Sequence, residues 1–446
     1  MTLMKLPFLH KKRRSTPPLL IAASFLLTIL IGTILLKLPA ATTAPITWTD
    51  AMFTAASATT VTGLSVFDIA STLTLFGELV LLALIQIGGV GLMAFAVAVL
   101  ILLGRKVGMK NRLFLQESFS QQSIGGTVKF LRSIFAFVFI TEGIAFILLS
   151  LVWVPKFGWT HGLYYSLFHV VSAFNNAGFS LFPDNLIGFA GDWPVTLIIS
   201  SLFIIGGLGF TVVLDLLTAR RARDWSLHTK MMVAGTLIMN AVAMIIWFLL
   251  EFHNAKTIGG MPVGDQLLTS YFQAVTPRTA GFNMVPIGDM TDSSMLLTLA
   301  LMFIGGGSAS TASGIKLTTF LVIVLATIAY FRGTNEPHLF NRTIKTEIIV
   351  RSLAIAAISS MVVFLACFLL TVTESFGFLP LFMETVSAFG TVGLSVGITG
   401  DLSPAGEWII SIVMFLGRIG PLTLFFLLIR QKKETFRYSY DRVHTG

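Results

Sequence analysis

A short polar stretch that ends in glycine occurs four times in the chain, each time between two apolar segments. The four glycines, Gly63, Gly178, Gly281 and Gly393, are separated by 115, 103 and 112 residues. A repeat of this length predicts one structural unit per copy, and therefore restricts the fold more than any local pattern does. We expect four pore repeats and a cytoplasmic tail, which are residues 15–112, 128–223, 228–332, 345–430 and 431–446.

The composition indicates an integral membrane protein. Hydrophobic residues make up 55% of the chain and charged residues 11%, with a mean hydropathy of +0.86, whereas soluble globular domains have about 25% charged residues. The single cysteine, Cys367, lies in an apolar run and excludes a disulfide framework or a cysteine metal site. The net charge of +9 does not indicate nucleic-acid binding, because the basic residues cluster beside the apolar runs as they do in cytoplasmic loops.

Each repeat has the same order of segments: a long apolar run, a short apolar segment, the polar stretch and a second long run. The long runs have enough residues to cross the ~30 Å hydrocarbon core as helices, whereas the short segments do not and fit helices that enter and turn back. The predicted fold is therefore an all-α integral membrane protein with eight transmembrane helices and four re-entrant pore loops, in four pseudo-symmetric helix-loop-helix repeats around one central pore. The long runs are residues 19–38, 74–103, 130–154, 193–217, 231–250, 294–330, 348–372 and 408–429, and the short segments are 48–59, 162–174, 265–275 and 379–388.

The basic residues are distributed unequally about these runs. Of the 30 Lys and Arg, 24 fall on the side of the two termini, two fall inside runs and four fall on the other side. Cytoplasmic loops carry an excess of Lys and Arg. We therefore expect both termini in the cytoplasm and all four re-entrant loops to enter from outside.

Four equivalent loops at membrane depth predict a cation pore. Irregular backbone inside a bilayer must be buried in protein or line a watery cavity, and four units satisfy this most simply by surrounding one axis. The short helices point the negative ends of their dipoles toward that axis, where backbone carbonyl, hydroxyl and amide oxygens replace the hydration water of a monovalent ion. One such stretch alone is more often an ordinary polar turn, but four matching copies favour a filter. The candidate cation-binding residues, with potassium as the metal, are Thr60, Val61, Thr62, Gly63, Asn175, Asn176, Ala177, Gly178, Arg278, Thr279, Ala280, Gly281, Gly390, Thr391, Val392 and Gly393.

A run of about ten small residues interrupts the second apolar segment of the third repeat. Glycine destabilises a helix by about 1 kcal/mol per position relative to alanine, so we expect a broken helix with a flexible loop just below the filter. A plain kink between packed helices is the alternative. In the first two repeats the corresponding residues, 87–91 and 205–209, are explained by close helix packing alone. The candidate gate residues in the third repeat are Gly305, Gly306, Gly307, Ser308, Ala309, Ser310, Thr311, Ala312, Ser313, Gly314 and Lys316.

Arg418 takes the place that glycine has in the other three copies of this pattern. A charge at bilayer depth is costly unless it faces water or a partner, and is therefore a candidate functional residue. We expect Arg418 to project beneath the filter and, with the loop, to form a barrier to cations. A structural salt bridge to a carboxylate on another helix is the alternative, and Lys316 has the further alternative of extending toward the cytoplasm.

With these glycines in place, the chain resembles the Trk/Ktr/HKT superfamily of cation transporters over about residues 15–435. The four glycines match that family's filter glycines, and the small residues of the third repeat match its gating loop. Glycine rather than serine at position 63 implies potassium permeation. Because the chain begins with the first repeat and has no nucleotide-binding domain, it most resembles the KtrB-type bacterial membrane subunit. That resemblance implies a homodimer in the bacterial plasma membrane, regulated by a cytoplasmic ring of RCK proteins that bind the nucleotide.

The expected function is that of a potassium uptake subunit, not of an enzyme. Potassium is the substrate, sodium is a candidate activator, and the chain itself is expected to bind no cofactor. A sodium-coupled or sodium-conducting transporter of the same fold is the alternative. An intramembrane enzyme would need a convergent set of carboxylate, histidine or serine side chains, and the sequence places no such cluster at one depth.

Overall fold

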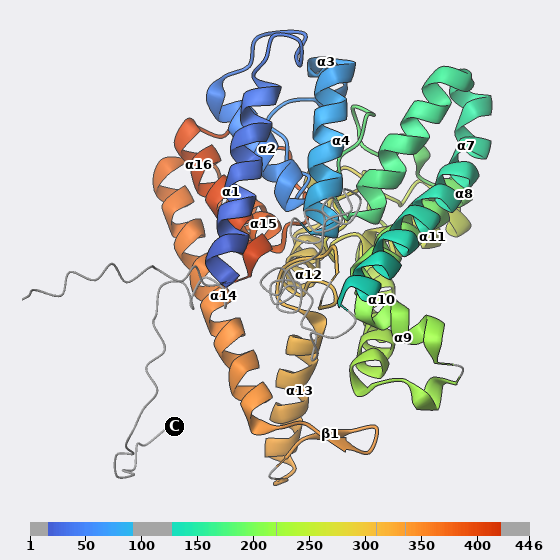
Figure 1. The fold of residues 1–446 in the computed structure, drawn as a ribbon, viewed down its shortest axis with the longest axis vertical. Coiled ribbons are helices and arrows are strands. Elements are labelled where there is room, and N and C mark those ends of the chain that lie inside the picture. The colour runs from blue at the N-terminus through green and yellow to red at the C-terminus, as the bar shows by residue number, and fades with distance from the viewer. Residues whose placement is uncertain (1–16, 92–126, 220, 309, 335, 421–446) are drawn as a thin grey trace, which may run out of the picture.

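The computed structural model of the chain describes residues 17–91, 127–219, 221–308, 310–334 and 336–420. These residues are mainly α-helical. Two short strands pair as a hairpin between the last residue of α13 and the first residue of α14 (Figure 1). The elements are α1 (Pro17–Leu36), α2 (Trp48–Thr60), α3 (Ile69–Thr72) and α4 (Leu75–Val90); α7 (Thr127–Phe174), α8 (Trp193–Leu208) and α9 (Phe210–Thr218); α10 (Leu227–Glu251), α11 (Val263–Val275), α12 (Asp292–Phe303) and α13 (Leu317–Phe331); and β1 (His338–Leu339), β2 (Arg342–Thr343), α14 (Thr346–Thr373), α15 (Phe378–Gly390) and α16 (Pro404–Ile419).

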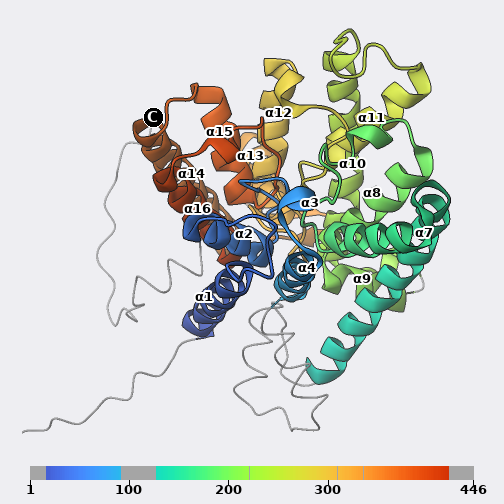
Figure 2. The same ribbon diagram turned by 90° about the horizontal axis from the view of Figure 1, so that it is seen from above.

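Figure 2 shows these four groups of helices following one another around the middle of the molecule. The first group meets the second where α4 packs on α7, and the second meets the third where α8 packs on α11. The third meets the fourth through α12 and α15, and α16 of the fourth packs on α2 of the first. The chain therefore closes a ring of four units.

The first helix of each group forms the outer wall. In the described part of the chain, α1, α7, α10 and α14 are long and apolar enough to cross a membrane, and the bent pair α8 and α9 makes a fifth candidate. These walls present large apolar side chains outward, such as Leu151 and Phe364, which are 69% and 75% exposed. Such a surface is stable in lipid and unfavourable in water.

Local sequence signals account for the start of α2 and for a bend in α7. At the start of α2, Thr47 accepts a hydrogen bond from the amide of Asp50, whose carboxylate accepts one from the amide of Thr47. In the second unit the predicted segments 130–154 and 162–174 belong to α7, which bends at Gly158 (φ 80°, ψ 170°). The glycine permits this bend because it has no Cβ to oppose a positive φ.

The second helices depart from the runs expected from sequence. The predicted run 193–217 is divided at Gly209 (φ 104°), where α8 and α9 meet at 96°. Gly91 and Gly420, at the matching positions after α4 and α16, also have positive φ values of 97° and 89°. In the third unit, where a break is expected, α12 and α13 are separate helices. The ends of the predicted runs 74–103 and 408–429 lie outside the described residues.

In the first, second and fourth units, the second helix touches the end of its own re-entrant helix through a glycine. A Cβ atom on Gly88, Gly206 or Gly417 would lie 2.1, 2.1 or 2.0 Å from a carbonyl oxygen near the end of α2, α7 or α15. Real Cβ atoms do not approach oxygen so closely, so these helices pack backbone against backbone. The close packing expected for the first two copies of the pattern is thus present.

We expect Gly88→Ala to destabilise the protein by about 1–3 kcal/mol, because the added methyl group overlaps the carbonyl of Thr59. Gly143→Ala is the matched control, since a Cβ on Gly143 meets nothing within 4 Å in the middle of α7. It should leave the stability unchanged or raise it by roughly 0.5–1 kcal/mol. Thermal unfolding in detergent measures both, and equal melting temperatures for the two variants would contradict the packing argument.

Candidate functional site

The four polar turns have one backbone conformation despite four different sequences. In each turn, the residue two positions before the glycine is left-handed: Val61, Asn176, Thr279 and Thr391 have φ values of 59°, 60°, 73° and 48°. The glycines that follow, Gly63, Gly178, Gly281 and Gly393, have φ values of 95°, 69°, 78° and 92°. Residues with a side chain rarely adopt positive φ values, and the values near 95° at Gly63 and Gly393 lie outside the left-handed region that they do adopt.

The turns lie against one another in a closed ring. At every glycine, an atom of the next turn occupies the space that a Cβ would need. This arrangement brings the predicted filter residues of all four units together, and it explains why each turn contains glycine at this position. The separations are 2.3 Å from a Cβ on Gly63 to the oxygen of Ala177, 2.8 Å from Gly178 to the Cα of Gly281, 2.2 Å from Gly281 to the oxygen of Val392, and 2.2 Å from Gly393 to the oxygen of Thr62.

Below this ring, residues 304–316 connect α12 to α13, with Ala309 outside the described residues. The loop folds back on itself, since the amide of Gly305 donates to the oxygen of Ile315 at 2.8 Å. It also crosses to the second unit, where the amides of Gly307 and Thr311 donate to the carbonyls of Gly207 and Gly206 at 2.8 and 3.3 Å. The predicted gate residues therefore lie between the second and third units.

One side chain of the loop contacts the ring directly. The hydroxyl of Thr311 donates to Oδ1 of Asn176 at 2.8 Å, and Nδ2 of Asn176 donates to the hydroxyl of Thr279 at 3.3 Å. Asn176 thus joins the second turn to the third turn and to the loop. The ammonium group of Lys316 points back into the loop and donates to the carbonyl of Ala312 at 2.7 Å.

Arg418 connects the loop to the first unit. Its Nη1 donates to the carbonyl of Thr311 and to the hydroxyl of Ser313 at 3.1 Å, and its Nη2 donates to the carbonyls of Gly88 and Gly89. None of the three ion pairs among the described residues includes Arg418. Arg418 therefore bonds to the loop and to the first unit, and among the described residues it forms no salt bridge, which was the alternative role.

This ring of four glycine turns, with a broken helix below it, can be compared with known proteins. The sequence profile of the TrkH family, described as cation transport protein, matches residues 6–438. The chain belongs to the TrkH family of cation transport proteins. The expected relationship to the Trk/Ktr group is thereby confirmed, and with it a multi-pass membrane protein.

Curated relatives of this TrkH-family chain match it over nearly their whole lengths. The Ktr system potassium uptake protein B of Bacillus subtilis (strain 168) is 52% identical over 433 residues, which are 97% of each chain. The protein of the same name from Vibrio alginolyticus is 40% identical over 98% of this chain and 96% of its own. The crystal structure of the potassium transporter TrkH from Vibrio parahaemolyticus has a TM-score of 0.71 at 20% identity, with 94% of this chain and 86% of that chain covered, and it supports the all-α fold.

Several side chains of the four turns donate hydrogen bonds to groups outside the turns. The hydroxyl of Thr60 donates to the oxygen of Ala56 at 2.7 Å. Nδ2 of Asn175 donates to Gln86 at 2.7 Å and to the buried carboxylate of Glu142 at 3.4 Å. The hydroxyl hydrogen of Thr60 and the amide hydrogens of Asn175 are thus used within the protein, whereas Oδ1 of Asn175 is buried without a hydrogen-bond partner.

Four hydroxyl residues support the turns and were not among the sequence candidates. Ser57 and Ser387 accept hydrogen bonds from the amides of Gly63 and Gly393, each at 3.1 Å. In the other two turns, Ser172 and Thr276 donate to the carbonyl that follows the glycine, at 2.7 and 2.5 Å. A hydroxyl residue five or six positions before every filter glycine was the sequence signal that could have identified them.

Ser57→Ala should lower the stability by about 1 kcal/mol, because the partly buried amide of Gly63 would lose its hydrogen-bond acceptor. We also expect slower cation flux into liposomes, since the turn loses a fixed support. Ser65→Ala is the control, because that hydroxyl donates to Phe67 outside the ring. The support is unimportant if Ser57→Ala and Ser65→Ala have the same melting temperature and flux.

Proposed function

We propose that the chain is the membrane subunit of a potassium uptake system and conducts potassium down its electrochemical gradient. The observation that carries this proposal is the closed ring, in which four turns of one conformation meet at four glycines. Two curated relatives named as potassium uptake proteins support the choice of ion. The four repeats, with the boundaries expected from sequence, are the units of this pore.

The sixteen predicted filter residues form the cation path of the proposed pore. Backbone carbonyls of the turns replace the water around the ion, and the negative ends of the re-entrant helices add a favourable field. Gly63 rather than serine at the first turn favours potassium. A sodium-conducting or sodium-coupled transporter stays the alternative, because a relative that is 34% identical, from Enterococcus hirae, is named potassium/sodium uptake protein NtpJ.

The loop of residues 305–316 and Arg418 form the gate, and the described contacts correspond to its closed state. Two observations support this assignment. The loop passes beneath the ring and bonds to Asn176 of the filter, and Arg418 ties the loop to the first unit. Together these contacts link the second helices of all four units at one level. Cations cannot pass this level until the loop moves.

We further propose a homodimer in the bacterial plasma membrane, with both termini cytoplasmic and a cytoplasmic RCK-type ring that binds the regulatory nucleotide. The chain itself binds no cofactor, and sodium is a candidate activator. The hairpin of β1 and β2 lies at the end of the molecule opposite α3 (Figure 1), on the side that the distribution of Lys and Arg makes cytoplasmic. That side is where a regulatory partner reaches the chain.

Purified protein in liposomes should take up potassium and rubidium faster than sodium. Gly63→Ser should reduce the preference for potassium over sodium roughly tenfold, because a side chain at φ 95° displaces the carbonyl of Ala177. Gly143→Ala is the control, and its flux should match the unchanged protein. The potassium assignment fails if sodium enters as fast as potassium in the unchanged protein.

Arg418→Gln should raise potassium flux severalfold, because the loop loses its charged donor and the positive barrier disappears. Arg351→Gln, an exposed arginine on α14, is the control and should leave the flux unchanged. A folded Arg418→Gln protein with unchanged or lower flux would contradict the gate and leave only a structural role for this arginine.

A further inference from the structure

A second buried arginine near the ring lacks a full set of acceptors. Arg278, in the third turn, is 8% exposed. Its Nη1 donates to Oδ1 of Asn240 at 3.0 Å, its Nη2 lies 3.5 Å from the hydroxyl of Thr236, and its buried Nε has no partner. None of the ion pairs among the described residues includes Arg278. A buried guanidinium with unmet donors costs free energy unless something else binds there.

Arg418 shows that this fold can satisfy a buried guanidinium with neutral groups. Its two terminal nitrogens donate to three carbonyls and one hydroxyl. Arg278 has two side-chain acceptors, of which Thr236 is at the limit of hydrogen-bond length. The difference between the two arginines indicates that the surroundings of Arg278 are incomplete.

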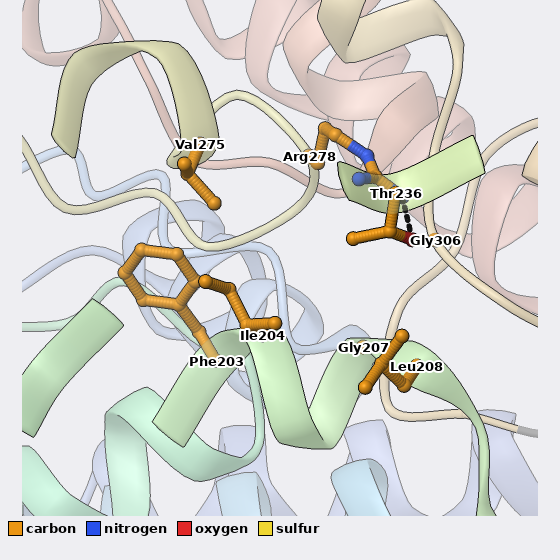
Figure 3. A pocket seen from close by; sticks show the side chains of 8 residues that line it. All are labelled: Phe203, Ile204, Gly207, Leu208, Thr236, Val275, Arg278 and Gly306. Carbon is orange, nitrogen blue, oxygen red and sulfur yellow. Dashed lines mark hydrogen bonds between the residues drawn. The ribbon is translucent and has the colours of Figure 1, made fainter. Parts of the chain in front are cut away.

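Arg278 lines a small pocket, which can hold an additional hydrogen-bond acceptor. Figure 3 shows its guanidinium beside Thr236, across the pocket from Phe203 and Ile204. The space admits about one water-sized particle. The walls come from α8, α10, the end of α11, the third turn and the gating loop, and consist of Phe203, Ile204, Gly207, Leu208, Thr236, Val275, Arg278 and Gly306.

The chemistry of the pocket selects a small anion. Arg278 and Thr236 are the polar side chains among its lining residues, and both carry hydrogen-bond donors. The positive charge repels a cation, and the size excludes phosphate or a carboxylate group. The remaining walls are apolar or backbone, which suits a weakly hydrated monatomic ion.

We propose that this pocket binds a halide ion, chloride under ordinary conditions, between Arg278 and Thr236. The anion completes the hydrogen bonding of Arg278 and neutralises a positive charge behind the third turn. The anion also touches Gly207 and Gly306. Their carbonyls accept hydrogen bonds from the amides of Gly307 in the gating loop and Leu317 at the start of α13. Binding of the anion is separate from cation conduction and is tested without measuring transport.

Thermal unfolding of the full chain in detergent tests the site. Potassium gluconate is replaced by potassium chloride up to 200 mM at constant ionic strength. An anion that binds only the folded state raises its stability in proportion to RT ln(1 + [L]/Kd), so the melting temperature should rise by about 2 °C. Arg278→Gln should abolish this rise and Thr236→Val should reduce it, whereas the control Arg351→Gln should retain it.

Crystals of the full chain soaked in potassium bromide give the second readout. An anomalous peak beside Arg278 and Thr236 is expected, and Arg278→Gln should lack it. The proposal is overturned if no bromide appears in the pocket, or if chloride raises the melting temperature equally in Thr236→Val and the unchanged protein. These two results decide the matter even if Arg278→Gln fails to fold.

Discussion

Backbone contact between neighbouring turns is the constraint on which the rest of the structure depends. At each of the four turn glycines, an atom of the next turn lies 2.2–2.8 Å from where a Cβ would be. The ring therefore closes only if all four positions lack a side chain and all four accept a positive φ. The position two residues earlier requires only a left-handed backbone, which Val61, Asn176, Thr279 and Thr391 all adopt. This difference explains why the glycines repeat while the rest of each turn varies. Three of the second helices use glycine in the same way, because Gly88, Gly206 and Gly417 contact the backbone at the ends of their re-entrant helices.

Fourfold similarity ends below the ring, and the two departures from it complement each other. In the third unit the helix is interrupted, so carbonyls such as that of Thr311 lose their helical donors. In the fourth unit Arg418 replaces a glycine and introduces donors that need acceptors at membrane depth. Each departure would be unfavourable alone. Together they are stable, because Arg418 donates to the carbonyl of Thr311 and to the first unit at the same time.

The features that the sequence predicted are those with local or periodic signals. The four turns, the short helices before them and the break between α12 and α13 follow from glycine content, segment length and repetition. The side-chain directions do not follow, because contacts between distant residues decide them. Asn175 turns toward Gln86, which is 89 positions away in the chain, and Arg418 reaches Gly88 across 330 positions. The sequence did not predict the bend at Gly209. The segments of α8 and α9 are apolar enough to count as one span, and hydropathy does not report a change of direction.

The contacts of Arg418 also indicate how much free energy a regulator of the proposed gate must supply. Moving the loop away removes Thr311 and Ser313 from Arg418 but leaves Gly88 and Gly89 in place. Hydrogen bonds to charged groups contribute roughly 1.5–3 kcal/mol each, so the two lost bonds favour the closed loop by about 3–6 kcal/mol. Shifting a two-state equilibrium from 1:99 to 99:1 takes about 5.5 kcal/mol of differential binding. The two quantities are of the same size. The two bonds to Arg418 alone therefore favour the proposed closed gate by about as much as one bound partner can offset, and the bonds of Gly307 and Thr311 to the second unit add to this.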